Sequence, residues 1–562
     1  MENVLQLIPL SSLVKVFPDT RPDGWYRGGS VLRNDRLSFQ VAYCGSRDLP
    51  AQEYSLSVSS PLKPYLSARQ VGVLPAEFLA YSRRDENYLR TTPGLYPDPL
   101  YPLLRGGQNQ PVVEVLPGRW HSLWFTLEIP DSAALSAGTY SVTVKLLPSE
   151  PDAKASSASV TLEFQLLDAA LTPDCFSLLY TNWFHADCLA SVYKVPVFSP
   201  RHWELMEAFI RTAAKNGMNM ILTPAFTPPL DTPVGGERLT VQLVEVYKAG
   251  EHYTFGFDKL GRWIDLCRRA GITHFEHSHL FTQWGAKAAP KIMGWENGEY
   301  KRLFGWDTPA DGEAYASFLH QYLPAVISFF REKGVDRQVW YHISDEPTLD
   351  NLDGYARAWA VVREELKGYE IFEALSSLEV YEKGYVTTPI PSTDHILPFL
   401  GRTDRLWTYY CGLQSVDLSN RFFSIPSARN RILGVQLYKY DIKGFLQWAF
   451  NFYYTVLSKK LANPFQTADA YGQIPAGSAY MVYPGEDGPI ESIRLAVFFE
   501  AIQDCAALRL LESRIGREET LQLIDDGIEP ITFTRYPHDD NYLLGLRQRV
   551  NRRLAESLRA PT

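Results

Sequence analysis

Hydrophobic and polar residues alternate with two different periods along this chain. Up to about residue 170, short segments alternate with the two-residue period of β-strands and are rich in β-branched and aromatic side chains. Clusters of Pro, Gly, Ser and Asp separate these segments. The spacing predicts an N-terminal β-sandwich over residues 1–172. Its clearest strands are residues 37–43, 53–60, 123–130, 140–147 and 159–167.

After residue 175 strand-like segments alternate with amphipathic helical segments, which indicates a parallel sheet with crossover helices. Each predicted helix ends at a glycine, the usual residue just past a helix C-terminus. These helices cover residues 201–217, 257–271, 314–334 and 354–368. The strands cover residues 176–184, 218–226, 272–281, 338–344, 369–376, 393–399, 406–412 and 444–454.

Eight strands with interleaved helices predict an α/β fold, a (β/α)8 TIM-type barrel over residues 173–515. Residues 475–495 have the pattern of a hairpin leading into a helix, so the barrel carries a C-terminal helical and β extension. Amphipathic segments beyond it predict a helical tail over residues 516–562.

The fourth predicted strand ends in two adjacent carboxylates, Asp345 and Glu346, followed by Pro347. The residues at the C-terminal ends of barrel strands carry the chemistry of such folds. Acidic residues before proline are equally common in ordinary surface turns, so this segment alone leaves both interpretations open.

Polar and aromatic residues also follow the other predicted strands and would share the same rim. Amides, imidazoles and aromatic rings suit a sugar, which needs hydrogen-bond partners and flat stacking faces. Each aromatic residue alone would fit a core position equally well, and only their convergence favours a site. The candidate substrate-binding residues are Asn182, His277, Trp284, Tyr409, Tyr410, Trp448 and Asn451.

Charge and cysteine content narrow the class of protein. The net charge of −9 gives no general nucleic-acid footprint. The six cysteines form no CxxC pair. No apolar run reaches the roughly 18 residues of a membrane span. The N-terminus lacks the basic region of a signal peptide. We therefore expect a cytoplasmic protein that binds neither nucleic acid nor membrane. His277 and His279 share one face of a strand, but no known zinc spacing accompanies them, so no metal or cofactor is expected.

Four segments together resemble glycoside hydrolase family 123 and its relatives. These are HISDEP (342–347), GFLQWAFNFYY (444–454), PAGSAYMVYPG (475–485) and residues 491–512, and the segment 127–146 resembles the β-sandwich that precedes the barrel in that group. The resemblance covers roughly residues 30 to 515.

The resemblance implies a β-N-acetylgalactosaminidase-like enzyme that uses substrate-assisted catalysis. Glu346 would be the general acid/base, and Asp345, expected to stay ionised, would orient the substrate's 2-acetamido group and stabilise the oxazolinium. The substrate would be an oligosaccharide or glycoconjugate. Two alternatives stay open: a non-catalytic carbohydrate-binding protein on the same scaffold, and a glycosidase for a sugar without the acetamido group. The second would need a distant carboxylate, for which Glu276 is the first candidate.

Overall fold

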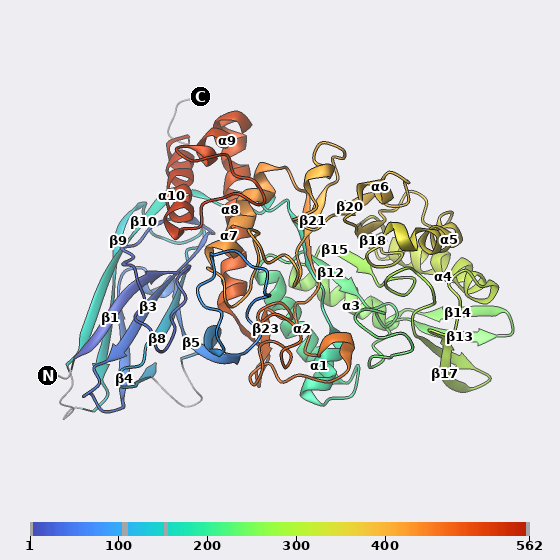
Figure 1. Cartoon of the computed structure of the whole chain (residues 1–562), viewed down its shortest axis with the longest axis horizontal. Helices are drawn as coiled ribbons and strands as arrows, with labels where there is room; N and C mark the ends of the chain where they lie inside the picture. The colour runs from blue at the N-terminus through green and yellow to red at the C-terminus, as the bar shows by residue number, and fades with distance from the viewer. Residues whose placement is uncertain (1–3, 104–110, 151–155, 558–562) are drawn as a thin grey trace.

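The computed structural model describes residues 4–103, 111–150 and 156–557. It is a mixed α/β protein with an all-β part at the N-terminus, on the left of Figure 1, and an α/β part on the right. Two five-stranded sheets make up the all-β part. The first has the order β1 (Leu5–Ser11), β3 (Arg36–Gly45), β8 (His121–Glu128), β5 (Leu66–Ala76) and β6 (Gly94–Pro102). The second has the order β2 (Ser30–Arg33), β10 (Ala158–Ala170), β9 (Gly138–Pro148), β4 (Gln52–Ser59) and β7 (Val112–Val115).

A separate hydrophobic core lies between these two sheets. Phe39 of β3 stacks on Phe125 of β8 at 4.9 Å and meets Phe164 of β10 at 5.0 Å, so the rings join the two sheets. The two-residue period in the sequence follows from this packing, because every second residue of β9 and most of β10 points into the core.

Eight short parallel strands form the centre of the α/β part. Six of them pair in the order β18, β15, β12, β11, β22, β21, and β19 pairs with β20. Single parallel bridges, Tyr341 to Ile371 and Ser392 to Tyr409, link this pair to β18 and β21, so the pairing runs in a circuit. The strands are β11 (Leu179–Asn182), β12 (Met220–Thr223), β15 (His274–His277), β18 (Val339–Tyr341), β19 (Phe372–Ala374), β20 (Thr388–Ile390), β21 (Trp407–Tyr409) and β22 (Gly444–Gln447).

The predicted sixth strand, residues 393–399, is wrong. That segment forms turns and a short 3₁₀ helix at Leu397–Phe399, and the sixth strand is β20, which precedes it. Pro389 and Pro391 lie in and beside β20, and prolines in a short run argue against a strand in sequence analysis.

The predicted helices are present with boundaries close to those expected. They are α2 (Pro200–Lys215), α3 (Asp258–Ala270), α4 (Glu313–Glu332) and α5 (Leu352–Val362). The sequence did not predict the shorter helices α1 (Ala186–Tyr193) and α6 (Leu378–Tyr381). A four-stranded sheet that the sequence did not predict lies at the right of Figure 1. It consists of β13 (Glu245–Ala249), β14 (His252–Gly256), β16 (Ile292–Glu296) and β17 (Glu299–Phe304).

The C-terminal helices join the two parts. Helix α8 (Ile493–Ile515) packs along α7 (Ala428–Lys439), and the hairpin β23 (Val482–Pro484) and β24 (Pro489–Glu491) leads into it. After α9 (Arg517–Asp525), α10 (Asp540–Ser557) returns to pack on β2 and β10 of the all-β part.

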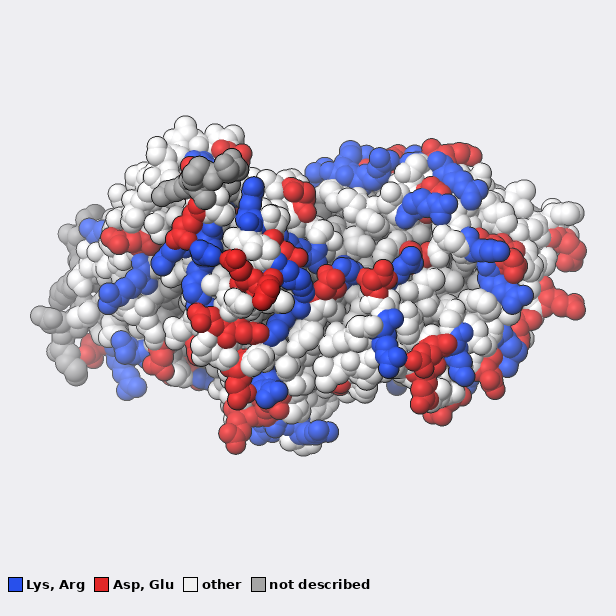
Figure 2. Space-filling view, turned by 90° about the horizontal axis from the view of Figure 1, so that it is seen from above, with Lys and Arg blue, Asp and Glu red and all other residues white. Residues whose placement is uncertain are grey.

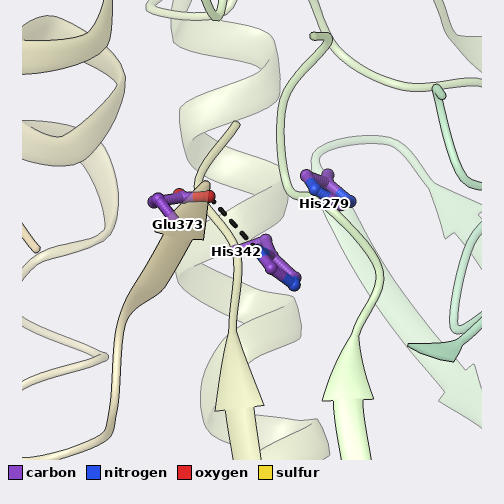
Figure 3. A group of neighbouring side chains, drawn as sticks. All are labelled: His279, His342 and Glu373. Atoms are coloured by element: carbon purple, nitrogen blue, oxygen red, sulfur yellow. Dashed lines mark hydrogen bonds and ion pairs between the residues drawn. The ribbon is translucent and has the colours of Figure 1, made fainter. Parts of the chain in front are cut away.

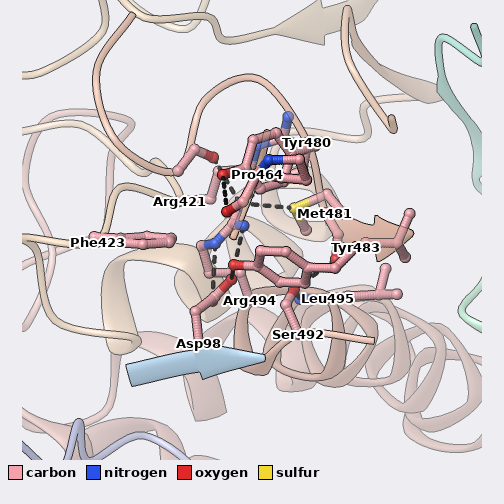
Figure 4. A network of polar contacts seen from close by, with 12 residues as sticks. Asp98, Arg421, Phe423, Pro464, Tyr480, Met481, Tyr483, Ser492, Arg494 and Leu495 are labelled. Carbon is pink, nitrogen blue, oxygen red and sulfur yellow. Dashed lines mark hydrogen bonds and ion pairs between the residues drawn. The ribbon is translucent and has the colours of Figure 1, made fainter. Parts of the chain in front are cut away.

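A buried ion pair connects the all-β part to helix α8. Asp98 of β6 accepts hydrogen bonds from both Nε and Nη2 of Arg494 of α8, at 3.0 and 2.9 Å, and Tyr483 also donates to Asp98. Arg494 donates further to the carbonyl oxygens of Gly477 and Tyr480. Figure 4 shows this network between the blue strand and the helix.

Positive and negative side chains are interspersed over the face seen in Figure 2. Among the described residues, no helix has the length and apolar character needed to cross a membrane.

Candidate active site

A pocket of 410 Å³ opens at the C-terminal ends of the parallel strands, within the size range of small-ligand sites. Both predicted acids line it. A larger groove of 1360 Å³ lies between the all-β part and α2, but among the described residues none from the C-terminal ends of the eight parallel strands lines it. The pocket lining includes Trp183, His185, Asp231, Gln283, Trp284, Asp345, Glu346, Tyr409, Leu413 and Trp448.

The backbone explains how two adjacent acids reach one pocket. Neighbouring residues of a regular strand point to opposite faces, but β18 ends at Tyr341, before the pair. Glu346 then has a φ of 47°, in the left-handed region that non-glycine residues seldom occupy. This turn cancels the alternation, so Asp345 and Glu346 both face the pocket. Asp231 and Trp284 of the lining also have positive φ, of 47° and 57°. Backbone strain of this kind concentrates at functional sites.

The two acids sit in different electrostatic surroundings. Burial raises the pKa of Asp345 well above its usual range, and the charges of Glu346 and Glu373 raise it further, although His342 opposes them. Tyr409 donates a hydrogen bond to Glu346 Oε1 at 2.9 Å. Burial beside two other carboxylates therefore favours the neutral form of Asp345, whereas the sequence analysis expected this residue to stay ionised.

The aromatic ring of Trp448 forms one wall of the pocket, and a hydrogen bond from a buried residue fixes its backbone. Its carbonyl oxygen accepts a hydrogen bond from His185 Nε2 at 3.0 Å, while His185 Nδ1 faces Arg238 Nη2 at 3.1 Å. Burial and the Arg238 charge lower the pKa of His185 well below its usual value, so the ring stays neutral. Asn451 does not line the pocket. Instead, its amide bonds both the backbone N–H and the carbonyl of His185, which makes it a support for this wall.

Three further predicted residues also lie outside the pocket. Asn182 contacts the hydroxyl of Tyr180, His277 that of Tyr322 in α4, and Tyr410 packs on Phe445. In each case the neighbouring residue points inward instead, namely Trp183, Glu276 and Tyr409. At β21 the sequence analysis named both Tyr409 and Tyr410, whereas strand alternation admits only one of them. At β11 and β15 it named the residue that points away from the interior.

The sequence analysis also missed pocket residues on connecting segments. Asp231 and Gln283 come from loops, and the backbone N–H of Asp231 donates to Gln283 Oε1 at 2.7 Å. Burial raises the pKa of Asp231. No periodic pattern marks such loop positions. Trp183 and His185, by contrast, lie at the C-terminal end of the predicted strand 176–184 and just beyond it, two residues apart, so strand alternation would have selected both.

A charged cluster is buried inside the ring of strands beneath the pocket. His342 lies between Glu276 and Glu373, with its ring nitrogens 3.1 and 3.2 Å from their Oε2 atoms, and all three side chains are fully buried. Burial lowers the pKa of His342, but the two carboxylates more than offset this and raise it to about 9. Glu276 also accepts hydrogen bonds from Trp183 Nε1 and from the hydroxyl of Thr181. It is thus not the distant carboxylate of the pocket, because other groups occupy both of its oxygens.

The cluster of His279, His342 and Glu373 brings donor atoms to within 4.8 Å of one another, the spacing of a possible metal site (Figure 3). The imidazole rings of His279 and His342 are stacked with centroids 4.2 Å apart and only 9° between their planes. Imidazole lone pairs lie in the ring plane, so two parallel rings cannot direct them at one ion. The carboxylates also occupy both nitrogens of His342. This geometry does not suit a metal site.

Comparison with known proteins agrees with this arrangement. The model of the glycoside hydrolase 123 catalytic domain matches residues 183–511. No curated protein matches the sequence. Among solved structures, a family 123 glycoside hydrolase from Clostridium perfringens superposes with a TM-score of 0.71 at 13% identity, covering 99% of this chain and 97% of that one.

Two other glycosidases share only partial similarity. A GH10 xylanase from Thermobacillus composti has a TM-score of 0.29 at 13% identity, over 58% of this chain and 97% of its own. An α-L-fucosidase from Lactobacillus casei has a TM-score of 0.26 at 13% identity, over 61% and 98%. The family model spans more than half of the chain and includes the acid pair and the pocket walls. The protein therefore belongs to glycoside hydrolase family 123.

Proposed function

We propose that the protein is a retaining β-N-acetylhexosaminidase, similar to a β-N-acetylgalactosaminidase, that uses the substrate's own acetamido group as nucleophile. The acid pair carries the proposal, because two adjacent carboxylates facing one pocket cannot flank a glycosidic bond at the separation that other mechanisms need. The scaffold would be a (β/α)8 barrel over residues 173–515, preceded by a β-sandwich and followed by a helical tail.

In the proposed mechanism the acetamido oxygen attacks the anomeric carbon while the glycosidic bond breaks. Glu346 gives its proton to the departing oxygen, and Asp345 stabilises the positive oxazolinium. Water then attacks the anomeric carbon and gives a proton to Glu346. The bond between the anomeric carbon and the acetamido oxygen breaks, which opens the oxazolinium ring. The two inversions retain the configuration.

The electrostatics of the pocket fit a change in the ionisation of Asp345 when substrate binds. The proton is favoured on Asp345 before substrate binds. An acetamido N–H that donates to Asp345 favours its ionised form, which is the form that stabilises the positive oxazolinium. The Tyr409 hydroxyl, which contacts Glu346, would orient that acid.

The substrate class follows from the pocket walls. Trp183, Trp284 and Trp448 provide flat apolar surfaces around the acids. The family 123 structure from Clostridium perfringens concerns hydrolysis of glycolipid glycans, so oligosaccharides and glycoconjugates that end in an N-acetylhexosamine are the proposed substrates.

Release of nitrophenol from three aryl glycosides tests the proposal: the β-N-acetylgalactosaminide, the β-N-acetylglucosaminide and the β-galactoside. We expect wild type to cleave an acetamido sugar but not the galactoside, and Asp345→Asn to lose at least about 100-fold in kcat/KM. Cleavage of the plain galactoside at a similar rate would contradict the proposal. Inactivity on all three would instead support a carbohydrate-binding protein.

A second candidate function rests on Asp231, the third carboxylate of the pocket. Its raised pKa and its position in the pocket wall suit a second acid of an ordinary glycosidase for a sugar without the acetamido group. However, its Oδ1 already accepts the backbone N–H of Leu457 at 3.2 Å, which fits a structural role. Galactoside cleavage that Asp231→Asn abolishes would favour this candidate.

A further inference from the structure

We propose that Glu373 and His342 are positioning residues for the acid pair, with the Glu373 carboxylate holding the backbone that leads into Asp345 and His342 holding that carboxylate. The proposal deepens the proposed function and rests on it, because it assigns these buried groups a role in the chemistry of Asp345 and Glu346.

The Glu373 carboxylate replaces a strand partner at the end of β18. Its Oε1 accepts the backbone N–H groups of Ile343 and Ser344, at 2.6 and 3.1 Å, and the hydroxyl of Tyr355 at 3.0 Å. Both N–H groups lie beyond the last residue of β18 and would otherwise be buried without an acceptor. A single side-chain oxygen therefore fixes the two peptide units that lead into Ser344, the residue before Asp345.

The opposite side of the same segment is held by residues 280–284. The N–H groups of Leu280, Phe281 and Trp284 donate to the carbonyl oxygens of residues 342, 343 and 345, at 3.1, 2.9 and 3.1 Å. The Ser344 hydroxyl donates to the carbonyl of Thr282 at 2.8 Å. The left-handed φ of Glu346 is unfavourable and persists only when its surroundings impose it. Glu373 and residues 280–284 supply that constraint from both sides.

His342 fixes Glu373 in turn and extends the network to the pocket wall. Its Nδ1 donates to Glu373 Oε2 and its Nε2 to Glu276 Oε2, which also accepts the indole N–H of Trp183 at 2.9 Å. A buried carboxylate needs such a partner, since an unpaired buried charge is costly. The network thus joins Trp183, on one side of the pocket, to the turn that carries the acids on the other.

Two substitutions at position 373 separate positioning from bulk stability. Glu373→Gln keeps an oxygen for the two N–H groups, and its amide can donate to His342 Nδ1 when the imidazole is neutral and carries its proton on Nε2. Glu373→Met keeps most of the volume but removes the acceptor. The matched control is Glu500→Gln, a buried carboxylate of α8 that pairs with Arg431 at 2.8 Å outside the pocket.

Two measurements on the full-length protein decide the outcome. Amide hydrogen exchange of the segment 342–346 reports on how firmly Glu373 holds this backbone, and it needs no knowledge of the substrate. Steady-state kinetics on the best glycoside of wild type report on its consequence. For Glu373→Met we expect faster exchange confined to that segment and a kcat at least about 100-fold lower, with KM changed less than about threefold. Glu373→Gln should stay within about tenfold of wild type in kcat, and Glu500→Gln should match wild type in both.

The other outcomes each have a definite meaning. Unchanged exchange at 342–346 in Glu373→Met would overturn the proposal, as would faster exchange with an unchanged kcat. An equal loss of kcat in the Gln and Met variants would also overturn it, because the retained oxygen would then make no difference. Inactivity of wild type on every glycoside would overturn the proposed function, and the exchange result would still decide whether Glu373 holds the turn.

Discussion

At the residue scale, Asp345 and Glu346 have the same chemistry but different environments. Asp345 is partly buried beside other carboxylates, while Glu346 accepts a hydrogen bond from Tyr409. In the proposed mechanism this asymmetry gives the two acids different roles. Such an arrangement costs stability, because a buried carboxylate is favourable only when it is neutral or well paired.

Replacing Asp345 by Asn should stabilise the protein in a pH-dependent way. Because the pKa of Asp345 is higher in the folded protein than the unfolded value near 4, wild type loses stability as the pH rises through the folded pKa. Asn cannot ionise, so the Tm of Asp345→Asn should exceed that of wild type at about pH 8, and the gap should close as the pH falls toward about 4. Calorimetry across this range, with the exposed Asp404→Asn as control, measures the gap. A constant difference in Tm at all pH values would contradict the assigned environment.

Tyr409 and Tyr410 provide a matched pair for the role of the hydroxyl at Glu346. A hydrogen bond to a charged group contributes roughly 1.5–3 kcal/mol, so Tyr409→Phe should lower kcat about tenfold to a hundredfold. Tyr410 points away from the pocket and its buried hydroxyl has no hydrogen-bond partner among the described residues. Tyr410→Phe should therefore keep wild-type kinetics. Equal effects of the two substitutions would show that the Tyr409 contact is irrelevant to the reaction.

At the element scale, α7 and α8 approach each other closely, and Phe498 of α8 packs on Tyr180 of β11 and Phe445 of β22. At Gly434 of α7, an added Cβ would lie 1.9 Å from the backbone oxygen of Ala501 in α8. Backbone atoms cannot move aside as a flexible side chain can. Only a residue without a Cβ therefore allows the two helix backbones to lie this close. The large apolar surfaces of the two helices are buried against each other and against the strands.

Gly434→Ala should force these helices apart and destabilise the protein by about 1–3 kcal/mol or more. The control is Gly545→Ala in α10, where an added Cβ meets only the tip of the Arg549 side chain at 3.5 Å. That change should stabilise the protein by up to about 1 kcal/mol, through helix propensity alone. Urea denaturation of both variants measures the difference, and a neutral Gly434→Ala would show that the helices are not in close contact.

The strands show how far sequence reasoning reached. Periodicity and the glycines after helices predicted the order of nearly all elements of the α/β part, because buried strands and amphipathic helices leave strong patterns. The pattern failed at β20, where prolines interrupt a three-residue strand, and in the sheet formed by β13, β14, β16 and β17. At the site, Asp345, Glu346, Trp284, Tyr409 and Trp448 were placed correctly at the pocket. Asn182, His277, Tyr410 and Asn451 were not, because the side-chain direction depends on exactly where each strand ends.

At the scale of the whole molecule, the all-β part and the α/β part share buried polar contacts. Besides the pair of Asp98 and Arg494, the ammonium of Lys15 donates to the carbonyl oxygens of Phe422, Phe423 and Ile425, at 2.7–2.9 Å. Burial lowers the pKa of Lys15 to about 7. Contacts of this kind make the parts depend on each other, so we expect them to unfold together.

Asp98→Ala should destabilise the protein by about 3–5 kcal/mol, since Arg494 would be left buried without its partner. Because Asp98 lies outside the pocket, kcat of the folded variant should equal that of wild type. The control, Glu529→Ala, breaks the exposed pair with Arg535 and should change stability by less than about 1 kcal/mol. Two separate calorimetric transitions in wild type would contradict the coupled unfolding.

The most direct test of substrate assistance changes the nucleophile and leaves the protein intact. In a series of aryl N-acetylhexosaminides whose acetyl group carries zero to three fluorine atoms, the carbonyl oxygen becomes a progressively weaker nucleophile. If this oxygen attacks the anomeric carbon, kcat/KM of wild type should fall steeply with each fluorine. A flat dependence would show that a group of the protein or a water molecule makes that bond, and would contradict the role assigned to Asp345 and Glu346.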